Sequence, residues 1–381
     1  MNVLITGGTG TISSGLVKES VNRGNMTYAI TRGTQNVRNI SGAIYITADI
    51  WNHDDIASKL GDLQFDVIVE CLVYDVEQLK ISLSNFADRC QQYIFISTAG
   101  VYQRIGEKRI SENDLKNCTD WSYTKNKIEC ENYLIKYATE NKMNYTIVRP
   151  TVTYGDYRIP FPIATRTPGW TFFDRMEKGQ LMLASDNVRF SIIHIEDFSK
   201  MVVSLFGNKK ALNEDFHITS DDGEILWDDV IKIAGKKLGV EPQIIHVPAN
   251  VIRKVWPSIY DELAYHKNTT QIFDNKKIKG VTNQTASISV EDGVRRTIDA
   301  MHYEFNYRKL EIDKDWNAKC DATIYYAYKK HLLSKHEMNV VACYMQKHGR
   351  NRMKSALRKS RIDALKRIIK EFLVLIRVRK K

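Results

Sequence analysis

The chain has few cysteines and prolines and contains no long apolar run. Its six cysteines form no Cys-x-x-Cys pair and no Cys/His cluster at zinc spacing, so we expect reduced thiols, no disulfide framework and no metal site. With only 7 prolines and 20 glycines in 381 residues, a collagen-like or low-complexity chain is excluded. No apolar run approaches the roughly 20 residues of a membrane-spanning helix, and no signal peptide precedes the first expected strand. We therefore expect a folded cytoplasmic protein.

The excess of positive charge lies at one end of the chain. The 56 Lys and Arg outnumber the 45 Asp and Glu, and the resulting formal net charge of +11 first suggests a nucleic-acid-binding protein. However, positions 330–381 hold 16 basic and 3 acidic residues, whereas the remainder holds 40 basic and 42 acidic ones. The basicity is therefore a property of a C-terminal tail.

The first 150 residues alternate short runs rich in Val and Ile with longer amphipathic stretches. This alternation is typical of strand and helix units around a parallel sheet. The expected strands are Val3–Thr6, Tyr28–Thr31, Ile44–Thr47, Val67–Cys71, Tyr93–Ser97 and Thr146–Arg149. We predict an α/β fold of the Rossmann type, with a doubly wound parallel sheet.

A glycine-rich turn joins the first expected strand to the first expected helix. Glycines let the backbone approach a pyrophosphate closely, and a helix N-terminus offers free N–H groups to it. Ser13 occupies the third glycine position of the usual spacing, where a small residue still allows close packing. We predict a dinucleotide site here, with a tight turn that binds nothing as the alternative. Its residues are Thr6, Gly7, Gly8, Thr9, Gly10, Thr11 and Ile12.

Two further positions bear on the adenosine end of that cofactor. Arg32 follows the second strand, where an acidic residue would bind the ribose 2′-hydroxyl, and an arginine would pair with a 2′-phosphate instead. We therefore favour NADP(H) over NAD(H), with a solvated surface arginine as the alternative. Asp49 follows the third strand and is predicted, with Ile50, to contact the adenine, unless Asp49 is a helix N-cap.

Tyr123 and Lys127 are four residues apart and would share one face of a helix. A phenol has an ordinary pKa of about 10, and a nearby ammonium favours the phenolate form. Lys127 could therefore lower the pKa of Tyr123 and also bind the cofactor ribose. The alternative is an ordinary surface pair, but Thr98, at the end of the fifth strand, places a hydroxyl at the edge where ligands bind parallel sheets.

With the glycine turn, Thr98 and the Tyr-x-x-x-Lys pair in this order, the chain resembles the extended short-chain dehydrogenase/reductase family. The resemblance covers about residues 1–301 and implies an NAD-dependent epimerase or dehydratase type of enzyme that modifies nucleotide sugars. It implies that Thr98 hydrogen-bonds the reacting oxygen, that Tyr123 transfers the proton, and that Lys127 contacts the ribose. It also implies a nicotinamide contact from Pro150. The expected substrate contacts are Tyr74, Thr98, Arg158 and Arg189.

Two departures from the family pattern narrow the chemistry. The family's 4,6-dehydratases carry an Asp-Glu pair after the catalytic threonine, whereas this chain has Ala99 and Gly100. Small residues there resemble the epimerases and 4-keto reductases, which need only hydride transfer and one proton-transferring tyrosine. The arginine that family epimerases use on the diphosphate is replaced by Phe190, with Arg189 one residue earlier.

The basic tail has apolar residues at helical spacing opposite Lys and Arg. Such a helix could lie on an anionic membrane surface, pack against a protein partner, or bind RNA through its phosphates. We regard a membrane or protein partner as better supported than nucleic acid. The protein would then be cytoplasmic, or peripheral at the inner face of a membrane.

The sequence thus predicts an NAD(P)-dependent nucleotide-sugar epimerase or 4-keto reductase, in glycan or polysaccharide precursor synthesis, that could form a homodimer. The alternatives are a non-catalytic dinucleotide-binding or RNA-binding protein on the same fold, and a nucleotide-sugar dehydratase. The dinucleotide-binding domain is assigned to 1–155 and about 190–220. A smaller α/β substrate-binding domain is assigned to about 156–189 and 221–310, and a basic helical extension to 311–381.

Overall fold

The chain folds into two units, each described here by itself. The computed structural model describes residues 1–33, 39–104, 106–156, 158–165, 169–221 and 224–378, with the side chains of the last helix placed through Asp363 and at Lys366. Unit 1 comprises Met1–Pro160, Arg189–Ile225 and Thr269–Thr297. Unit 2 comprises Phe161–Val188, Leu226–Asn268 and Ile298–Lys381.

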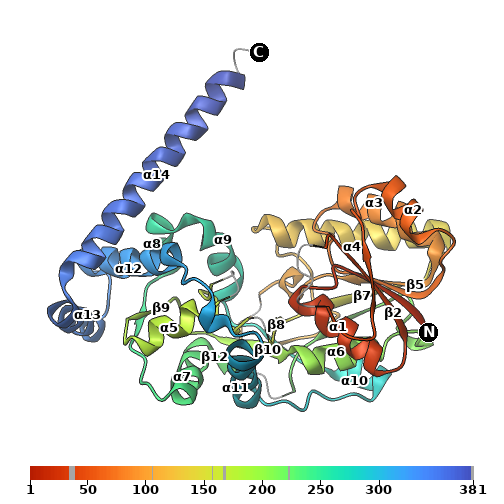
Figure 1. Cartoon of the computed structure of the whole chain (residues 1–381), viewed down its shortest axis with the longest axis horizontal. Helices are drawn as coiled ribbons and strands as arrows, with labels where there is room; N and C mark the ends of the chain where they lie inside the picture. The colour runs from red at the N-terminus through yellow and green to blue at the C-terminus, as the bar shows by residue number, and fades with distance from the viewer. Residues whose placement is uncertain (34–38, 105, 157, 166–168, 222–223, 379–381) are drawn as a thin grey trace. The chain divides into compact units, whose positions relative to one another are not determined.

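Unit 1 is built around a seven-stranded sheet (Figure 1). Every strand pair in it is parallel, and the chain order reverses between the neighbours β1 and β4. Such a reversal leaves a crevice at the carboxyl ends of the strands, where ligands bind. In spatial order the strands are β11 (Glu214–Ile218), β7 (Tyr145–Pro150), β5 (Cys90–Ile96), β4 (Phe65–Glu70), β1 (Asn2–Thr6), β2 (Met26–Thr31) and β3 (Ile44–Thr47).

Helices cover both faces of this sheet, which confirms the predicted doubly wound Rossmann type. On one face, Leu16 of α1 (Thr11–Asn22) and Phe198 of α6 (Ile195–Val203) pack in one core with Val3 and Ile5 of β1. On the other face, α2 (His53–Leu60), α3 (Val76–Phe86) and α4 (Ser122–Asn141) pack in a second core with Leu4. The central strands are continuous apolar runs because both of their faces are buried.

The six strands expected in the first 150 residues are all present, with ends that differ by at most three residues. Beyond residue 150 the chain forms the strands β10 (Arg189–His194) and β11 and the helices α6 and α7 (Trp227–Leu238). Gly239 ends α7 with a φ of +71°, as a C-terminal glycine does. The hydrophobic pattern of the sequence was therefore sufficient to locate these six strands.

Unit 1 also contains residues 269–297, whereas the sequence predicts them to be part of the substrate-binding domain. β14 (Ile272–Phe273) pairs with β6 (Arg109–Ile110), and α10 (Lys276–Thr282) follows it. The Asn275 side chain accepts a hydrogen bond from Thr219 N and donates one to Thr219 O. The remaining strands of this unit are β8 (Val152–Tyr154), which pairs with β10, and β12 (Glu224–Leu226).

Unit 2 is mainly helical. A two-stranded sheet pairs β9 (Met182–Ala184) with β13 (Ile244–His246). The buried Arg175 of α5 donates to Asp321 of α12 at 2.6 Å. Its helices are α5 (Thr171–Glu177), α7, α8 (Ala249–Val255), α9 (Tyr260–Glu262), α12 (Lys314–Lys329), α13 (Lys335–His348) and α14 (Arg350–Val378), and α11 (Val290–Asp299) spans the boundary between the units.

The C-terminal part differs from the predicted extension. Cys320 and Ile324 of α12 are fully buried, so this helix belongs to the core of unit 2 rather than to an appended tail. The basic segment is α14, which differs from α12 in its large excess of Lys and Arg over Asp and Glu. Among the described residues, no helix is long and apolar enough to cross a membrane.

Candidate functional site

The predicted cofactor residues lie at the carboxyl ends of β1, β2, β3 and β7, along one edge of the sheet. Gly7 and Gly8 follow β1 with φ angles of +92° and +42°. A Cβ on Gly8 would lie 2.9 Å from the Cβ of Ala29, and a Cβ on Gly7 would lie 3.0 Å from Leu72 Cδ2. Both positions therefore require glycine, because backbone angles and available space exclude a side chain.

The glycine turn leads directly into the N-terminus of α1. Gly10 is the N-cap in an extended conformation, and its N–H donates to the Ser13 hydroxyl at 3.1 Å. Ser13 thus fills the third glycine position and also closes the first turn. Because the first turn contains no acidic residue, the free N–H groups and the positive end of the helix dipole favour an anion at Thr11 and Ile12.

Arg32 and Asp49 are the residues predicted to contact the adenosine part of the cofactor. Arg32 is exposed immediately after β2, and Asp49 is exposed after β3. The Asp49 carboxylate accepts a hydrogen bond from Trp51 N at 3.1 Å. Asn52, not Asp49, is the N-cap of α2, so the alternative role that we considered for Asp49 is wrong. Ile50 is buried.

Thr98, Tyr123 and Lys127 come from two neighbouring elements. Thr98 is buried at the end of β5, and its Oγ1 accepts from Gly100 N at 3.1 Å, which leaves the hydroxyl proton able to donate. Tyr123 and Lys127 both lie on α4. Lys127 donates to the carbonyl oxygens of Val73 at 2.6 Å and of Ile96, two residues before Thr98, at 2.8 Å.

The surroundings of Lys127 lower the pKa of its ammonium group. The side chain is buried, and burial lowers the pKa of Lys127 to about 8, against the opposing influence of nearby acidic groups that include Glu70. The ammonium lies 5.2 Å from the centre of the Tyr74 ring and 4.7 Å from that of Phe95. An ammonium has three donors, so two backbone bonds leave one N–H for a ligand.

Two aromatic rings, those of Trp121 and Tyr74, lie beside Tyr123. Its ring centre lies 4.8 Å from that of Trp121 and 6.2 Å from that of Tyr74. Tyr74 is 52% exposed, so it lies at the surface beside both Tyr123 and Lys127. Burial of its hydroxyl nevertheless raises the pKa of Tyr74, which keeps it a neutral phenol. The structure thus brings a predicted substrate contact against the predicted catalytic pair.

The other predicted residues have different surroundings. Pro150 is buried at the end of β7, and Arg158 is half-buried in a backbone bridge with Gly155. Arg189 forms ion pairs with Glu107 and Glu224 at the surface of unit 1. A diphosphate bound by Arg189 would have to compete with these two carboxylates.

Sequence reasoning missed Glu70, the last residue of β4. Its carboxylate is fully buried and accepts from Thr6 Oγ1 at 2.7 Å, from Leu72 N at 2.7 Å and from Ser82 Oγ at 2.6 Å. Thr6 precedes the glycine turn, and Leu72 is the residue packed against Gly7. An acidic residue at the end of an apolar strand is unusual, and this could have drawn attention to Glu70. Its hydrogen-bond partners could not be predicted because they are far apart from one another in the sequence.

A second buried carboxylate, Glu131, joins α4 to the sheet. It lies one turn after Lys127 and accepts both Nε and Nη2 of the fully buried Arg149 at 2.8 Å. Ser97 Oγ, next to Thr98, donates to the same carboxylate at 2.6 Å. This bidentate pair holds the helix that carries Tyr123 and Lys127 against β5 and β7.

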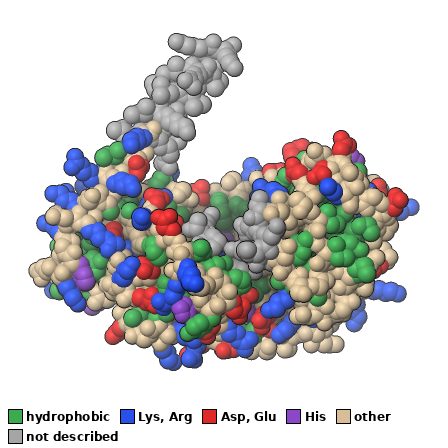
Figure 2. Space-filling view, in the orientation of Figure 1, with side chains coloured by type: hydrophobic (Ala, Val, Ile, Leu, Met, Phe, Trp, Pro, Cys, Tyr) green, Lys and Arg blue, Asp and Glu red, His purple; other side chains and the backbone are tan. Residues whose placement is uncertain are grey.

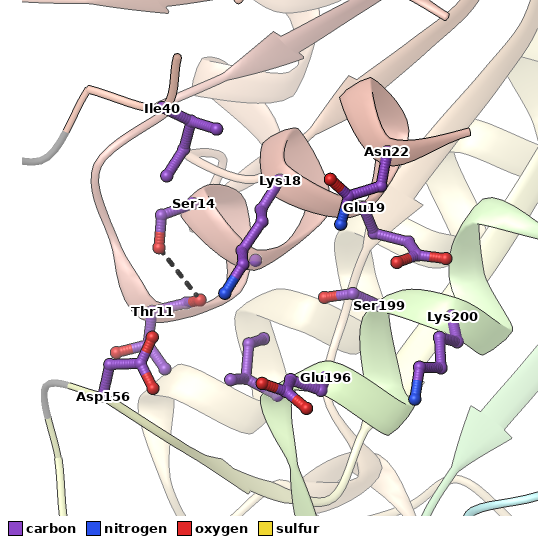
Figure 3. A pocket seen from close by; sticks show the side chains of 12 residues that line it. Thr11, Ser14, Lys18, Glu19, Asn22, Ile40, Asp156, Glu196, Ser199 and Lys200 are labelled. Atoms are coloured by element: carbon purple, nitrogen blue, oxygen red, sulfur yellow. Dashed lines mark hydrogen bonds between the residues drawn. The ribbon is translucent and has the colours of Figure 1, made fainter. Parts of the chain in front are cut away.

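A pocket of about 230 Å³ lies between α1 and α6, near the glycine turn (Figure 3). The Lys18 side chain points into it, and Thr11 and Asp156 line the same pocket. Because Glu19, Asp156 and Glu196 also line the pocket, its charge does not suit a pyrophosphate. Among the residues that the structure describes, no group of His, Cys, Asp and Glu could hold a metal ion.

The chain is similar to several known proteins. The model of the NAD dependent epimerase/dehydratase family matches residues 3–219. The chain is 27% identical over 260 residues, 64% of its length, to the chloroplast stem-loop binding protein of 41 kDa b of Arabidopsis thaliana. It is 25% identical over 304 residues, 70% of its length, to the divinyl chlorophyllide a 8-vinyl-reductase of Cucumis sativus. The chain spans 65% and 66% of the lengths of these two relatives.

Solved structures agree on the fold. The UDP-glucuronic acid 4-epimerase of Bacillus cereus, in complex with UDP-glucuronic acid and NAD, superposes with a TM-score of 0.64 and 18% identity. The superposition covers 79% of this chain and 99% of that chain.

Proposed function

Because the chain belongs to the NAD dependent epimerase/dehydratase family, we propose that it is an NAD(P)-dependent epimerase or 4-keto reductase that acts on a nucleotide sugar. The observation that carries this proposal is the single edge at which the glycine turn, Thr98, Tyr123 and Lys127 meet. A protein that only binds nucleotides needs the glycine turn but has no use for a buried lysine that lies over the Tyr74 ring and one helical turn after Tyr123. The nucleotide-sugar substrate rests on the similar fold of an epimerase in complex with UDP-glucuronic acid and NAD.

The residues present fit a nicotinamide dinucleotide. The turn at Gly7 and Gly8 has no room for side chains, so its backbone can contact a pyrophosphate, and the first turn of α1 would contribute N–H groups. When bound, the nicotinamide would accept or donate a hydride. Asp49 and Ile50 would contact the adenine, Lys127 the ribose and Pro150 the nicotinamide. Arg32, exposed after β2, favours NADP(H) over NAD(H) because it can pair with a 2′-phosphate.

In this proposal Tyr123 moves the proton. Its phenolate would take the proton from a sugar hydroxyl, and the resulting phenol would return that proton to the carbonyl oxygen of a ketone as the ketone is reduced. The charged form of Lys127 would stabilise the phenolate. Thr98 would donate its hydroxyl proton to the same sugar oxygen and orient it. Tyr74, Arg158 and Arg189 are proposed to contact the substrate. Ala99 and Gly100 follow Thr98 without carboxylates, so the elimination of water that a dehydratase performs has no acid or base at those positions.

A second candidate function is RNA binding, alone or beside catalysis. It is favoured by the 27% identity to a stem-loop binding protein and by the exposed basic residues of α14. The Thr98, Tyr123 and Lys127 set argues against a protein that binds RNA only. If the protein both catalyses a reaction and binds RNA, one purified preparation should show both activities.

The proposal is tested by incubating the purified chain with UDP-glucose, UDP-glucuronic acid or a UDP-linked 4-keto sugar and each of NAD⁺, NADH, NADP⁺ and NADPH. Proton NMR of the sugar would follow inversion at one carbon, and absorbance at the nicotinamide band would follow net reduction or oxidation. Epimerisation without net change of cofactor supports an epimerase, and consumption of NADPH with a 4-keto sugar supports a reductase. Failure with every sugar tested, combined with binding to an RNA hairpin, would favour the second candidate.

A further inference from the structure

One face of the first turns of α14 is attached to unit 2. Met353 and Leu357 are buried, and Arg352 Nε donates to Asp321 of α12 at 2.9 Å. Ser360 Oγ donates to the carbonyl oxygen of Val255 at 3.1 Å. These contacts fix the start of the helix on the unit and leave the other sides of the same turns exposed to solvent.

One of the exposed sides is strongly basic. Lys354, Arg358 and Arg361 are exposed at spacings of four and three residues, which places them in one stripe along the helix. None of the three forms an ion pair within the part of the chain that the structure describes. Figure 2 shows Lys and Arg side chains, together with some Asp and Glu, on unit 2 around the base of α14. Ile362, which is 45% exposed, follows this stripe.

The charge of this segment restricts the kind of partner. Positions 350–381 hold 13 Lys and Arg against 2 Asp and Glu, an excess that equals the formal net charge of +11 of the whole chain. Two copies that paired along α14 would bring these like charges together and repel each other. The charge therefore selects an anionic partner over a second copy of this chain.

The sequence of α14 distinguishes between anionic partners. From Ile362 onward, apolar residues recur at spacings of three and four residues, at Leu365, Ile369, Phe372 and Ile376. Contact with RNA phosphates has no need of an apolar stripe. A helix that combines such a stripe with Lys and Arg is typical of binding in the plane of a membrane interface. At about 1.5 Å per residue, the 29 residues of α14 would extend roughly 43 Å along such a surface.

We propose that α14 binds the surface of a lipid bilayer that carries anionic headgroups. The Lys354, Arg358 and Arg361 stripe contacts the headgroups, and the apolar residues from Ile362 onward enter the boundary between headgroups and acyl chains. This attachment is peripheral and reversible, and it depends on ionic strength because the charges lie within a Debye length of the surface. It does not depend on the proposed reaction.

The test is co-sedimentation of the full chain with vesicles of neutral phosphatidylcholine or of phosphatidylcholine with 30% phosphatidylglycerol. We expect binding to the anionic vesicles, at least tenfold weaker binding to the neutral ones, and release as salt is raised. The triple variant Lys354→Glu/Arg358→Glu/Arg361→Glu should lose at least tenfold in affinity. The matched control Lys136→Glu/Lys209→Glu/Lys210→Glu changes the net charge equally on exposed residues of unit 1 and should bind as the parent chain does.

A second variant tests the apolar stripe. Phe372→Ser/Ile376→Ser keeps every charge and should also weaken vesicle binding at least tenfold, while far-ultraviolet circular dichroism shows that the chain remains folded. The proposal is overturned if neither vesicle binds the parent chain. It is also overturned if a single-stranded RNA binds equally well to the parent and to Phe372→Ser/Ile376→Ser while vesicles do not bind, or if light scattering shows a dimer that this variant abolishes.

Discussion

Thr6 donates its hydroxyl to the buried carboxylate of Glu70 at 2.7 Å, so the last residue of β1 is joined to the last residue of β4 directly beneath the glycine turn. The same carboxylate accepts the N–H of Leu72, whose neighbour Val73 accepts the ammonium of Lys127. One side chain therefore positions both the predicted pyrophosphate turn and the backbone that holds the predicted catalytic lysine.

Glu70→Gln should weaken cofactor binding about tenfold. The amide preserves the volume but cannot accept all three hydrogen bonds, and an unsatisfied buried group costs about 1–3 kcal/mol, where about 1.4 kcal/mol is tenfold in an equilibrium constant. Titration calorimetry with NAD(H) and NADP(H) measures the effect. The matched control is Gln92→Glu, because buried Gln92 also makes three hydrogen bonds, to Thr146, Leu205 and Gly207. Equal loss of affinity in both variants would show that only general stability had changed.

Tyr123→Phe should reduce turnover by about 10²–10⁴-fold, the usual contribution of one general acid or base. Cofactor affinity should stay within about twofold, because the removed hydroxyl moves a proton and does not hold the dinucleotide. Steady-state rates and a parallel binding titration separate the two effects. Tyr133→Phe makes the same change on the same helix, where Tyr133 stacks on Tyr137, and should leave turnover unchanged. Turnover retained by Tyr123→Phe would exclude Tyr123 as the proton-transferring group.

Burial of Lys127 predicts a specific dependence of stability on pH. Its pKa is about 8 in the folded chain, below the ordinary value of 10.5, so between these values the unfolded chain binds more protons at this group. The contribution of Lys127 to the free energy of unfolding must therefore rise with pH from about 8 to 10.5. Urea unfolding of the parent chain and of Lys127→Met at several pH values isolates this contribution as a difference. A constant difference across that range would show that the ammonium is not buried.

Arg32→Ala tests the preference between cofactors. If Arg32 pairs with a 2′-phosphate, its loss should weaken NADPH binding by roughly tenfold to a hundredfold, the equivalent of one charge-assisted hydrogen bond of about 1.5–3 kcal/mol. NADH binding should stay unchanged because that cofactor has a hydroxyl at the position. Lys18→Ala, in the pocket between α1 and α6, serves as a nearby control that removes one positive charge. Equal effects of Arg32→Ala on both cofactors would contradict the preference for NADP(H).

The sheet and the position of the site could be predicted because they depend on local patterns. The run Val3–Thr6 is apolar since both faces of β1 are buried, and Gly7 and Gly8 are required by backbone angles that other residues rarely adopt. The spacing of Tyr123 and Lys127 needs only the helix α4. Each of these features depends on only a few consecutive residues, so it can be recognised in the sequence.

The partners of buried charges could not be predicted because they depend on tertiary contacts. Glu70 and Ser82 lie on different elements, and Glu131 meets Arg149 only after α4 packs against β7. Residues 269–297 join unit 1 through β14, a strand of two residues that leaves no periodic signal. The burial of Cys320 and Ile324 could not be predicted because α12 mixes apolar residues with Lys, Asp, Asn and Thr and gives no clear amphipathic pattern.

The central claim is that the edge with Gly7, Gly8 and Lys127 binds a nicotinamide dinucleotide. The most direct measurement is to denature the purified chain, identify any released nucleotide by mass spectrometry, and titrate the emptied chain with NAD(H) and NADP(H). The account predicts either a stoichiometric dinucleotide retained through purification, as for an epimerase that recycles its own hydride, or an empty site that binds NADPH in preference to NADH. Binding of none of these nucleotides by a folded chain would contradict it.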